Sequence, residues 1–544
     1  MRSISIPSAL SLLSATLTLT QTTIAASTSE WKTRSIYQIM TDRFALTDGS
    51  TEVACDAADM IYCGGTWQGI INKLDYVQDM GFDAIYISPI TAGLTENTKE
   101  GENYHGYWPQ DIYEANSNFG TADDLKDLAE ALHNRGMWLM VDVVINDMGY
   151  AVASGDEASD IDYSVFTPFN SEEYFHSYCE ITNYTNYTNA QVCWLGDDIV
   201  ALPDLDTEND EVVSLMTSWV SDLVANYSVD GLRVDAAKHV SDAFLKEFAT
   251  AAGMYSVGEV YEGDAAVFCP YQDLMPGMTN YPNYFSVIEA FTNGNISDLS
   301  YQIAVTKSLC PDTTILASFS ENHDLPRIGY YTDDVSLAKS VIAYTIMADG
   351  VPMIYQGQEQ FFTGNSTPYN REALWTSNYD NTSELYTFTT LANKMRRHAI
   401  NVDSSYVDYQ SQVIYTDGST IALRKGNEGQ QIITVLSNSG SEQTSYTLTI
   451  PNAFTPGTEV MEVVACKNYT INDYGQLQVP MDKGTPHIFF QANKMNGSFI
   501  CGMGNWSVSN YGDGSSSAAS TTQTSMMASS IGAILIMAMT FSLL

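Results

Sequence analysis

Three stretches of this sequence are short apolar runs that each lead into an acidic residue. Residues 229–234 lead to Asp235, residues 255–258 lead to Glu259, and a third run leads to Asp324. A buried parallel strand is nearly all apolar, and a functional carboxylate at its carboxyl end is typical of α/β barrels. One such acid alone is more often a helix cap or a surface charge. Because the pattern occurs three times, we expect the three carboxylates to meet at one rim of a barrel.

The remaining strands of a barrel can be found on the same criteria. Eight runs have the length and composition of buried parallel strands: 35–40, 82–88, 137–145, 229–234, 255–260, 278–281, 314–319 and 351–355. Helical patterns lie between them, for example at 70–80 and 211–227, and one starts at the N-cap candidate Thr121, with Asp124 three residues later. Alternation of strands and helices predicts a (β/α)8 TIM barrel.

Two segments do not fit the barrel repeat. Residues 146–206 follow the third strand and are far longer than the usual 2–6 residues of a βα loop, which indicates an inserted domain. From about residue 401 the chain has short alternating segments separated by turn signals, which predicts a C-terminal antiparallel β-sandwich. The predicted order is a signal peptide (1–26), the barrel (27–145 and 207–400), the inserted domain (146–206), the sandwich (401–502) and a Ser/Thr-rich linker with a tail signal (503–544).

The charge of the chain limits its partners. There are 65 acidic and 23 basic residues, a formal net charge of −42. A field of this sign repels phosphate, so we expect no nucleic-acid partner and no electrostatic binding to anionic lipid. A neutral polysaccharide is not affected by it.

Both ends of the sequence predict export. Arg2, an apolar run at 4–19 and the small pair Ala25 and Ala26 are typical of a cleaved secretory signal; the alternative is an N-terminal anchor, for which the run is short. Residues 526–544 are apolar and uncharged, without the basic flank of a single-pass anchor. With small residues at 516–518, they predict a glycosylphosphatidylinositol (GPI) attachment signal, a retained anchor or a disordered tail being the alternatives. We therefore expect an extracellular, GPI-anchored and monomeric protein.

Other features agree with an extracellular protein. Eight cysteines in an oxidising compartment allow four disulfides. Potential N-glycosylation triplets begin at Asn183, Asn186, Asn226, Asn295, Asn365, Asn381, Asn468, Asn496 and Asn505.

The strand-end motifs around Asp235, Glu259 and Asp324 resemble those of glycoside hydrolase family 13, the α-amylase family, and the similarity to secreted fungal α-amylases runs from about Trp31 to Cys501. The resemblance implies that Asp235 is the nucleophile, Glu259 the acid/base and Asp324 the acid that stabilises the transition state. Arg233 lies two residues before Asp235, on the same side of the strand, and is expected to keep that carboxylate ionised. The disulfide pairs implied by the resemblance, and suggested by spacing, are Cys55 with Cys63, Cys179 with Cys193, Cys269 with Cys310, and Cys466 with Cys501.

The resemblance also implies substrate contacts. The loop around Tyr107 is rich in aromatic residues, whose flat faces suit sugar rings, although a satellite hydrophobic cluster is the alternative. Lys238 and Arg371 could instead be solvated charges. The implied substrate-binding residues are His105, Tyr107, Trp108, Arg233, Lys238, His239, Gly263, His323 and Arg371.

A calcium site is implied in the same way. Its ligands would be the side chains of Asn146 and Asp204 and the backbone carbonyls of Gln191 and His239. Calcium prefers such an all-oxygen set, and the ion would pin the inserted domain to the strand-four motif.

Two positions depart from the family pattern. Asp147 stands where the family has a histidine that contacts the sugar at the cleavage position, and Thr367 replaces an acidic residue that binds a more distant sugar. Losing one such hydrogen bond could cost about 1–3 kcal/mol, which weakens hydrolysis and favours transfer to another sugar. The favoured function is an α-1,4-glucan enzyme at the cell surface, with 4-α-glucanotransferase activity in cell-wall α-glucan metabolism. An ordinary α-amylase that hydrolyses starch and a non-catalytic glucan-binding wall protein are the alternatives.

Overall fold

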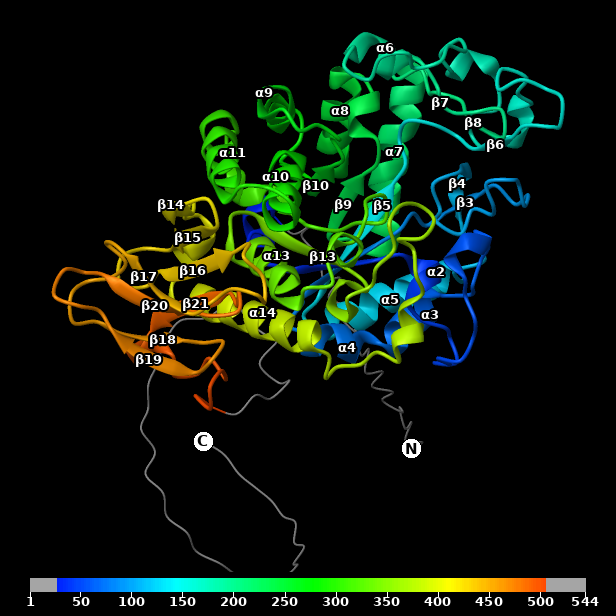
Figure 1. Cartoon of the computed structure of the whole chain (residues 1–544). Coiled ribbons are helices and arrows are strands. Elements are labelled where there is room, and N and C mark those ends of the chain that lie inside the picture. The colour runs from blue at the N-terminus through cyan, green and yellow to red at the C-terminus, as the bar shows by residue number, and fades with distance from the viewer. Residues whose placement is uncertain (1–26, 505–544) are drawn as a thin grey trace, which may run out of the picture. The chain divides into compact units, whose positions relative to one another are not determined.

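A computed structural model describes residues 27–504, so the predicted signal peptide and nearly all of the predicted linker and tail lie outside the described residues (Figure 1). Eight parallel strands form its central sheet: β1 (Ile36–Ile39), β2 (Ala84–Ile87), β5 (Trp138–Val143), β9 (Gly231–Val234), β10 (Tyr255–Gly258), β11 (Gly277–Met278), β12 (Ala317–Ser318) and β13 (Val351–Tyr355).

The central sheet closes into a barrel. Its strand order is β11-β10-β9-β5-β2-β1-β13-β12, and an isolated parallel bridge between Thr279 and Ala317 joins the two ends. Every residue of these strands is buried except Trp138, as expected for a parallel sheet covered on its outer face by helices. The predicted (β/α)8 barrel is therefore confirmed.

Helices surround the barrel and connect its strands, except α6 (Tyr187–Val192), which belongs to the inserted segment. They are α1 (Thr28–Trp31), α2 (Thr41–Phe44), α3 (Trp67–Asn72), α4 (Leu74–Asp79), α5 (Ala122–His133), α6 (Tyr187–Val192), α7 (Asp210–Tyr227), α8 (Asp242–Ala252), α9 (Ala265–Phe268), α10 (Tyr281–Thr292), α11 (Ile296–Leu309), α12 (Ile328–Tyr331), α13 (Val335–Met347) and α14 (Glu384–Val402). The predicted cap of α5 is present, because the Thr121 hydroxyl accepts from the Asp124 backbone N–H and the Asp124 carboxylate accepts from the Thr121 N–H.

Three predicted boundaries were wrong for local reasons. The helix expected at 70–80 is divided into α3 and α4, because the backbone leaves helical geometry at Lys73. The sixth strand is shorter than expected, because Asn280 caps α10 and Pro282 occupies its first turn. The seventh is shorter because Asp312 caps a 3-10 turn at 313–315, inside the predicted strand.

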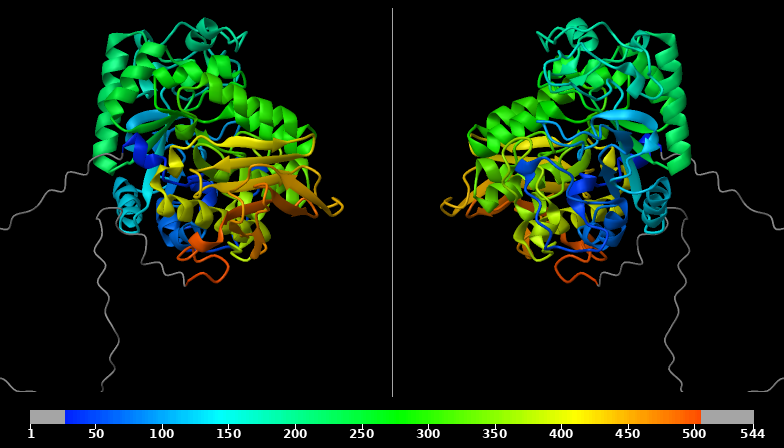
Figure 2. Two further views of the ribbon diagram at one scale, coloured as in Figure 1. Left: turned by 90° about the vertical axis from the view of Figure 1, so that its left-hand side faces the viewer. Right: turned by 90° about the vertical axis from the view of Figure 1, so that its right-hand side faces the viewer.

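The inserted segment and the C-terminal segment lie on opposite sides of the barrel in the views of Figures 1 and 2. The first carries a small antiparallel sheet of β6 (Tyr150–Ala151), β8 (Val200–Leu202) and β7 (Leu195–Gly196). A separate antiparallel pair, β3 (Thr91–Gly93) and β4 (Pro109–Ala115), flanks the aromatic loop.

The C-terminal segment is an antiparallel β domain, as predicted. Its two sheets contain six and two strands: β14 (Gln412–Thr416), β15 (Thr420–Lys425), β16 (Ile432–Ser437), β21 (His487–Gln491), β18 (Glu459–Glu462) and β19 (Lys467–Thr470) in one, with β17 (Tyr446–Ile450) and β20 (Leu477–Met481) in the other. The helix α14 continues past residue 401, so this domain begins later than expected.

The four predicted disulfides are all formed: Cys55–Cys63, Cys179–Cys193, Cys269–Cys310 and Cys466–Cys501. Within residues 27–504, no helix combines the length and the apolar character needed to cross a membrane.

Candidate functional site

A cavity of about 600 Å³ opens at the carboxyl ends of the barrel strands. Ten of the residues predicted to be catalytic or substrate-binding line it: His105, Tyr107, Trp108, Asp235, Lys238, His239, Glu259, His323, Asp324 and Arg371. Two predicted residues do not. Arg233 lies beneath the cavity, and Gly263, expected to approach the substrate with its backbone, lies outside its lining.

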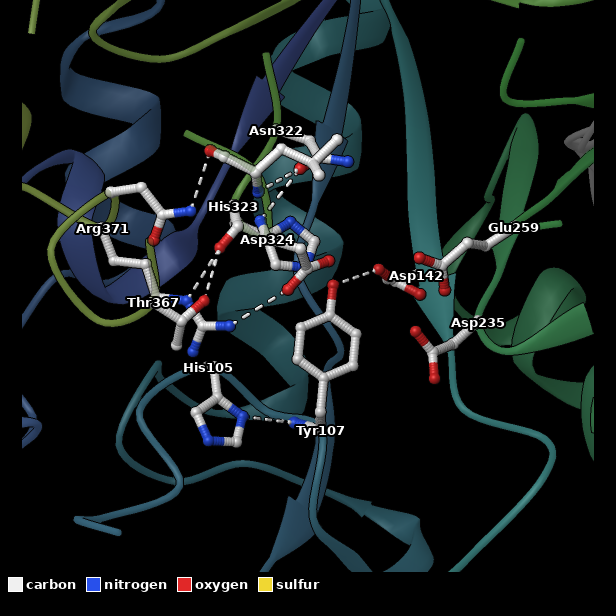
Figure 3. Close-up of polar contacts among 12 residues, drawn as sticks. His105, Tyr107, Asp142, Asp235, Glu259, Asn322, His323, Asp324, Thr367 and Arg371 are labelled. Atoms are coloured by element: carbon white, nitrogen blue, oxygen red, sulfur yellow. Dashed lines mark hydrogen bonds and ion pairs between the residues drawn. The ribbon is translucent and has the colours of Figure 1, made fainter. Parts of the chain in front are cut away.

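The two acids that follow β9 and β10 share one arginine. Nη1 of Arg233 donates to Oδ1 of Asp235 (2.5 Å), and Nη2 pairs with Oε2 of Glu259 (3.0 Å). The backbone N–H groups of Asp235 and Glu259 continue the strand ladder to the carbonyls of Val143 and Val234 (2.9 and 2.8 Å). The barrel therefore fixes both acids from the backbone, and the guanidinium of Arg233 pairs with both carboxylates. Figure 3 shows Asp235 and Glu259 next to each other.

A third acid, not predicted, completes this group. Asp142 and Arg233 are register partners on β5 and β9, so their side chains point to the same side, and Nη1 of Arg233 lies 3.0 Å from Oδ2 of Asp142. We call Asp142, Arg233, Asp235 and Glu259 the cleft cluster. An acidic residue within an otherwise apolar strand was the sequence signal for Asp142 that we did not use.

The charges of the cleft cluster do not balance, since one guanidinium faces three acids. Burial raises the pKa of Asp235 well above its ordinary value; Arg233 opposes this shift, and the charges of Glu259 and Asp142 add to it. Burial likewise raises the pKa of Asp142, against the effect of Arg233. The expectation that Arg233 alone keeps Asp235 ionised was therefore too simple, because the cluster retains protons to higher pH than isolated carboxyls do.

Asp324 is held on the facing side of the cavity. Nη2 of Arg371 donates to its Oδ1 (3.2 Å), and Nε2 of His323 lies 3.1 Å from its Oδ2. Because the amide nitrogen of Gln38 contacts Nδ1 of His323 (2.9 Å), the proton of this imidazole belongs on Nε2, directed at Asp324. Arg371 is buried and paired, so the alternative of a solvated charge is wrong for it.

Tyr107 forms a flat wall between these two sides. Its hydroxyl donates to Oδ2 of Asp142 (2.6 Å), its backbone N–H donates to Nδ1 of His105 (3.0 Å), and its ring stacks on His323 with centroids 5.1 Å apart (Figure 3). Burial, and next the charge of Arg371, lower the pKa of both histidines well below the ordinary value, so both rings are neutral. Neutral rings beside a flat phenol suit an uncharged ligand.

Other predicted contacts have mixed outcomes. Lys238 is buried and donates to the carbonyl of Tyr261 and to Glu262 (both 3.2 Å), so it is not a solvated charge. Trp108 lines the cavity but also packs with Leu94 and Val200, so the hydrophobic-cluster alternative holds in part.

Tyrosines connect the two sides in a way the sequence did not reveal. The hydroxyl of Tyr281 donates to Oε1 of Glu259 (3.3 Å) and accepts from the amide of Asn322 (3.2 Å), whose Oδ1 accepts from the Asp324 N–H (2.9 Å). Tyr261, half exposed, lines both this cavity and an adjoining one. Nothing in the local sequence around Tyr281 indicates this link, because helix α10 is positioned by the whole barrel.

The predicted calcium ligands lie where the inserted segment meets the barrel. Oδ1 of Asn146 and Oδ1 of Asp204 are buried and have no hydrogen-bond partner within residues 27–504, and the same is true of Oδ1 of Asp147. We call Asn146, Asp147 and Asp204 the insert cluster. Buried oxygen atoms without a hydrogen-bond partner destabilise the folded protein, and they suit an ion that prefers oxygen ligands.

The two predicted backbone ligands lie on elements that hold the insert to the barrel directly. The amide of Gln191 donates to the Val240 carbonyl (2.9 Å), and Nδ1 of His239 lies 3.0 Å from the Ala190 carbonyl. The insert is therefore attached at the strand-four motif by hydrogen bonds of the chain itself.

A different group of side chains could also hold a metal. One ligand atom each of His176, Asp206 and Glu208 lies within 4.8 Å of the others. His176 also contacts Oδ2 of Asp204 through Nδ1 (2.6 Å). Burial lowers the pKa of His176, but Asp204, Asp206 and Glu208 outweigh it and raise the pKa overall, which indicates that the ring can carry a proton here instead of a metal.

Comparisons with known proteins agree with this site. Residues 38–401 match the family "Alpha amylase, catalytic domain" and residues 413–509 match "Alpha-amylase, domain C". The chain is 47% identical to Alpha-amylase 2 of Schwanniomyces occidentalis over 479 residues, 88% of this chain and 94% of that protein. It is 51% identical to Alpha-amylase 1 of Lipomyces kononenkoae over 90% of this chain and 78% of the relative.

A solved structure is similar over nearly the same range. The α-amylase from Malbranchea cinnamomea is superposed with a TM-score of 0.85 at 45% identity, covering 88% of this chain and all of that one. The barrel, the C-terminal β domain and these matches lead to one conclusion. The chain belongs to the α-amylase family, glycoside hydrolase family 13, and is an enzyme of that family.

Proposed function

We propose that this protein is a retaining enzyme that cleaves and transfers α-1,4-glucan chains, with Asp235 as nucleophile, Glu259 as acid/base and Asp324 as the acid that stabilises the transition state. The observation that carries the proposal is the single guanidinium of Arg233, which pairs with both Asp235 and Glu259 at the floor of the cavity, with Asp324 held on the facing side. Retention requires the two acids about 5–5.5 Å apart, so that one sugar linkage fits between them.

The first step would be a displacement at the anomeric carbon. Asp235 forms a bond to that carbon while the bond to the glycosidic oxygen breaks and Glu259 gives this oxygen a proton. A glucan chain with a free 4-hydroxyl leaves, and a covalent glycosyl-enzyme remains. The cleft cluster suits this step, because Arg233 pairs with the carboxylate of Asp235, which must carry a negative charge to attack, and also with Glu259 beside it.

The second step decides between hydrolysis and transfer. Glu259, now a base, takes a proton from water or from a sugar hydroxyl, and the new oxygen displaces Asp235 from the anomeric carbon. Water gives a shorter glucan, whereas a sugar 4-hydroxyl gives a new α-1,4 linkage. Both outcomes use the same residues.

The walls of the cavity would bind neighbouring sugars. Tyr107, His105 and His323 offer a flat face and neutral nitrogen atoms, and Arg371 holds Asp324 towards the sugar. On the other side, Lys238 and His239 line the cavity beside Tyr261. An exposed aromatic ring near the departing chain suits the stacking of an incoming sugar, which supports transfer.

The reaction balance is the open part of this proposal. Asp147 and Thr367 depart from the family pattern and favour transfer in the context of wall α-glucan. The similar proteins are named α-amylases, which favours ordinary α-amylase activity at least as strongly. A non-catalytic glucan-binding protein is disfavoured, because Asp235, Glu259 and Asp324 all line one cavity.

Calcium is proposed as the structural ion. Asn146 and Asp204 would hold it with their side chains and Gln191 and His239 with their backbone carbonyls, and the ion would supply positive charge where the insert joins the barrel. The residues present fit it, since the side-chain oxygens are buried and without partners.

The proposed location is the cell surface, through the predicted signal peptide and GPI attachment signal. Its support is composition: a charged start followed by an apolar run, and a terminal apolar segment without charges. Treatment of intact producing cells with a phospholipase specific for phosphatidylinositol should release the enzyme; retention on the cells after detergent-free phospholipase treatment would contradict the lipid anchor.

One incubation tests the reaction. The purified enzyme is given maltoheptaose, and products are separated by length over time, with Asp235→Asn as the inactive control. Products longer than seven sugars show transfer, and only shorter ones show a plain hydrolase. If Asp235→Asn retained wild-type activity, the nucleophile assignment would be wrong.

A further inference from the structure

Asp147 and Asp204 are cross-strand neighbours. The Met148 N–H donates to the Pro203 carbonyl (3.2 Å), and the Leu205 N–H donates to the Asn146 carbonyl (2.8 Å). These two bonds flank the antiparallel bridge between Asp147 and Asp204 and make it the non-hydrogen-bonded type, in which Cα atoms are about 4.5 Å apart. Opposite residues of such a pair place their side chains on the same face, so the two carboxylates lie next to each other.

Each of these carboxylates has one oxygen with a partner and one without. Oδ2 of Asp147 accepts from the Asn146 amide (3.2 Å), and Oδ2 of Asp204 is 2.6 Å from Nδ1 of His176. Both Oδ1 atoms are buried and have no hydrogen-bond partner in the part of the chain that the structure describes. Asp147 is 3% exposed and Asp204 is 0% exposed, so bulk water does not hydrogen-bond to these oxygens either.

The charge around the pair is also incomplete. Asp147 makes no ion pair within residues 27–504, and Asp204 pairs only with His176 there. Two acids directly opposite each other repel unless a cation or a proton lies between them. Oδ1 of Asn146, from the residue before Asp147, is a third buried oxygen without a partner.

Asp147 is poorly placed to replace a sugar contact. Its side chain borders the catalytic cavity, but its unpaired Oδ1 is inaccessible to solvent, and its other oxygen is bonded to Asn146. A sugar hydroxyl in the cavity could not reach the unpaired oxygen without a rearrangement. That oxygen is therefore available to a group buried between the insert and the barrel.

We infer that Asp147 is a ligand of the calcium ion proposed for this site, so that the insert cluster binds the ion through two carboxylates and one amide. This inference rests on the calcium site of the proposed function and extends it to a residue outside the expected set. Calcium takes six to eight oxygen ligands, and added carboxylate charge tightens its binding. Asp147 would then serve metal binding in place of substrate binding.

The test measures calcium affinity, not activity. The secreted chain is freed of calcium with a chelator, and calcium is titrated calorimetrically into wild type and into Asp147→Asn, Asp204→Asn and Asp206→Asn. We expect at least tenfold weaker binding for Asp147→Asn, a larger loss for Asp204→Asn, and little change for Asp206→Asn, which lies outside the insert cluster but beside His176.

The outcomes distinguish a wrong assignment of Asp147 from a wrong calcium site. If Asp204→Asn weakens binding and Asp147→Asn does not, Asp147 is no ligand and the calcium site stands. If neither does, or if only Asp206→Asn weakens binding, the proposed calcium site is itself wrong. Should Asp147→Asn fail to fold, a lanthanide-soaked crystal of the unmutated chain decides: an anomalous peak about 2.3–2.6 Å from Oδ1 of Asp147 supports the inference, and a peak beyond its reach overturns it.

Discussion

The cleft cluster and the insert cluster both crowd acids at one rim of the barrel, and they differ in how the negative charge is compensated. The cleft cluster sets three acids around Arg233, whose guanidinium pairs with each of them. The insert cluster sets Asp147 and Asp204 side by side with buried oxygens that nothing in the described chain serves. The cleft cluster has its cation on strand β9. The insert cluster has only Nδ1 of His176, which contacts Asp204.

The difference follows from what each group does. A cation covalently fixed on β9 cannot leave, so the cleft keeps its geometry through each reaction cycle. The insert cluster lies where the inserted segment meets the barrel, and an ion bound there can be exchanged. In this molecule the acids without a fixed cation are those proposed to bind an ion, and the acids around Arg233 are those proposed to carry out the reaction.

The largest expected effect is on the cleft cluster. Asp235→Asn removes the proposed nucleophile while keeping its shape, so turnover of maltoheptaose should fall by about four orders of magnitude or more. Calcium affinity should stay at the wild-type value, because the insert cluster is untouched. A variant with near-normal turnover would show that Asp235 is not the nucleophile.

Removing the fixed cation should damage both stability and activity. Arg233→Met leaves the buried Asp142 and the half-buried Asp235 and Glu259 without their cation. Breaking a buried ion pair such as Asp142–Arg233 typically costs about 3–5 kcal/mol. Chemical denaturation measures this loss, and Arg233→Lys, which keeps the charge, should recover part of it. Equal stability of Arg233→Met and wild type would show that the cleft acids do not need this cation.

Removing calcium should affect stability in a pH-dependent way. Burial raises the pKa of Asp147 to about 7 and that of Asp204 to about 8. A carboxyl whose pKa is raised in the folded state favours the protonated form there, so the calcium-free protein is most stable at low pH. Its free energy of unfolding falls as pH rises from about 4 to 8, by up to about 1.4 kcal/mol per pH unit for each carboxyl. Melting curves with chelator or excess calcium should therefore differ more at pH 8 than at pH 5; a difference independent of pH would contradict this.

The smallest expected effect is a shift in the pKa of Asp235 when one charge of the cleft cluster is removed. Asp142→Asn removes one of the charges that raise the pKa of Asp235, so that pKa should fall. The acidic limb of kcat/KM against pH should move to lower pH, by up to about one unit. Loss of the Tyr107 contact lowers activity in addition, but a merely structural change would leave the position of the limb unchanged.

Much of this arrangement was predictable before the structure. The eight strands, the cap at Thr121 and the four cysteine pairs follow from local patterns and from the family resemblance. The short sixth and seventh strands did not, because a cap at Asn280 or Asp312 competes with strand formation over only a few residues.

Local patterns were enough to place Asp235 and Glu259 directly after strands β9 and β10, because an apolar run and its final residue are local properties of the chain. Asp324 was predicted at a strand end but lies in the loop beyond β12, which stops at Ser318. Tertiary structure alone decided that Asp142 lies beside Arg233 and that Asp147 lies opposite Asp204, since each pair depends on the register between segments far apart in sequence. Register is set by closure of the whole barrel and by docking of the insert. For that reason the acids could be named from the sequence, but not their partners or the balance of their charges.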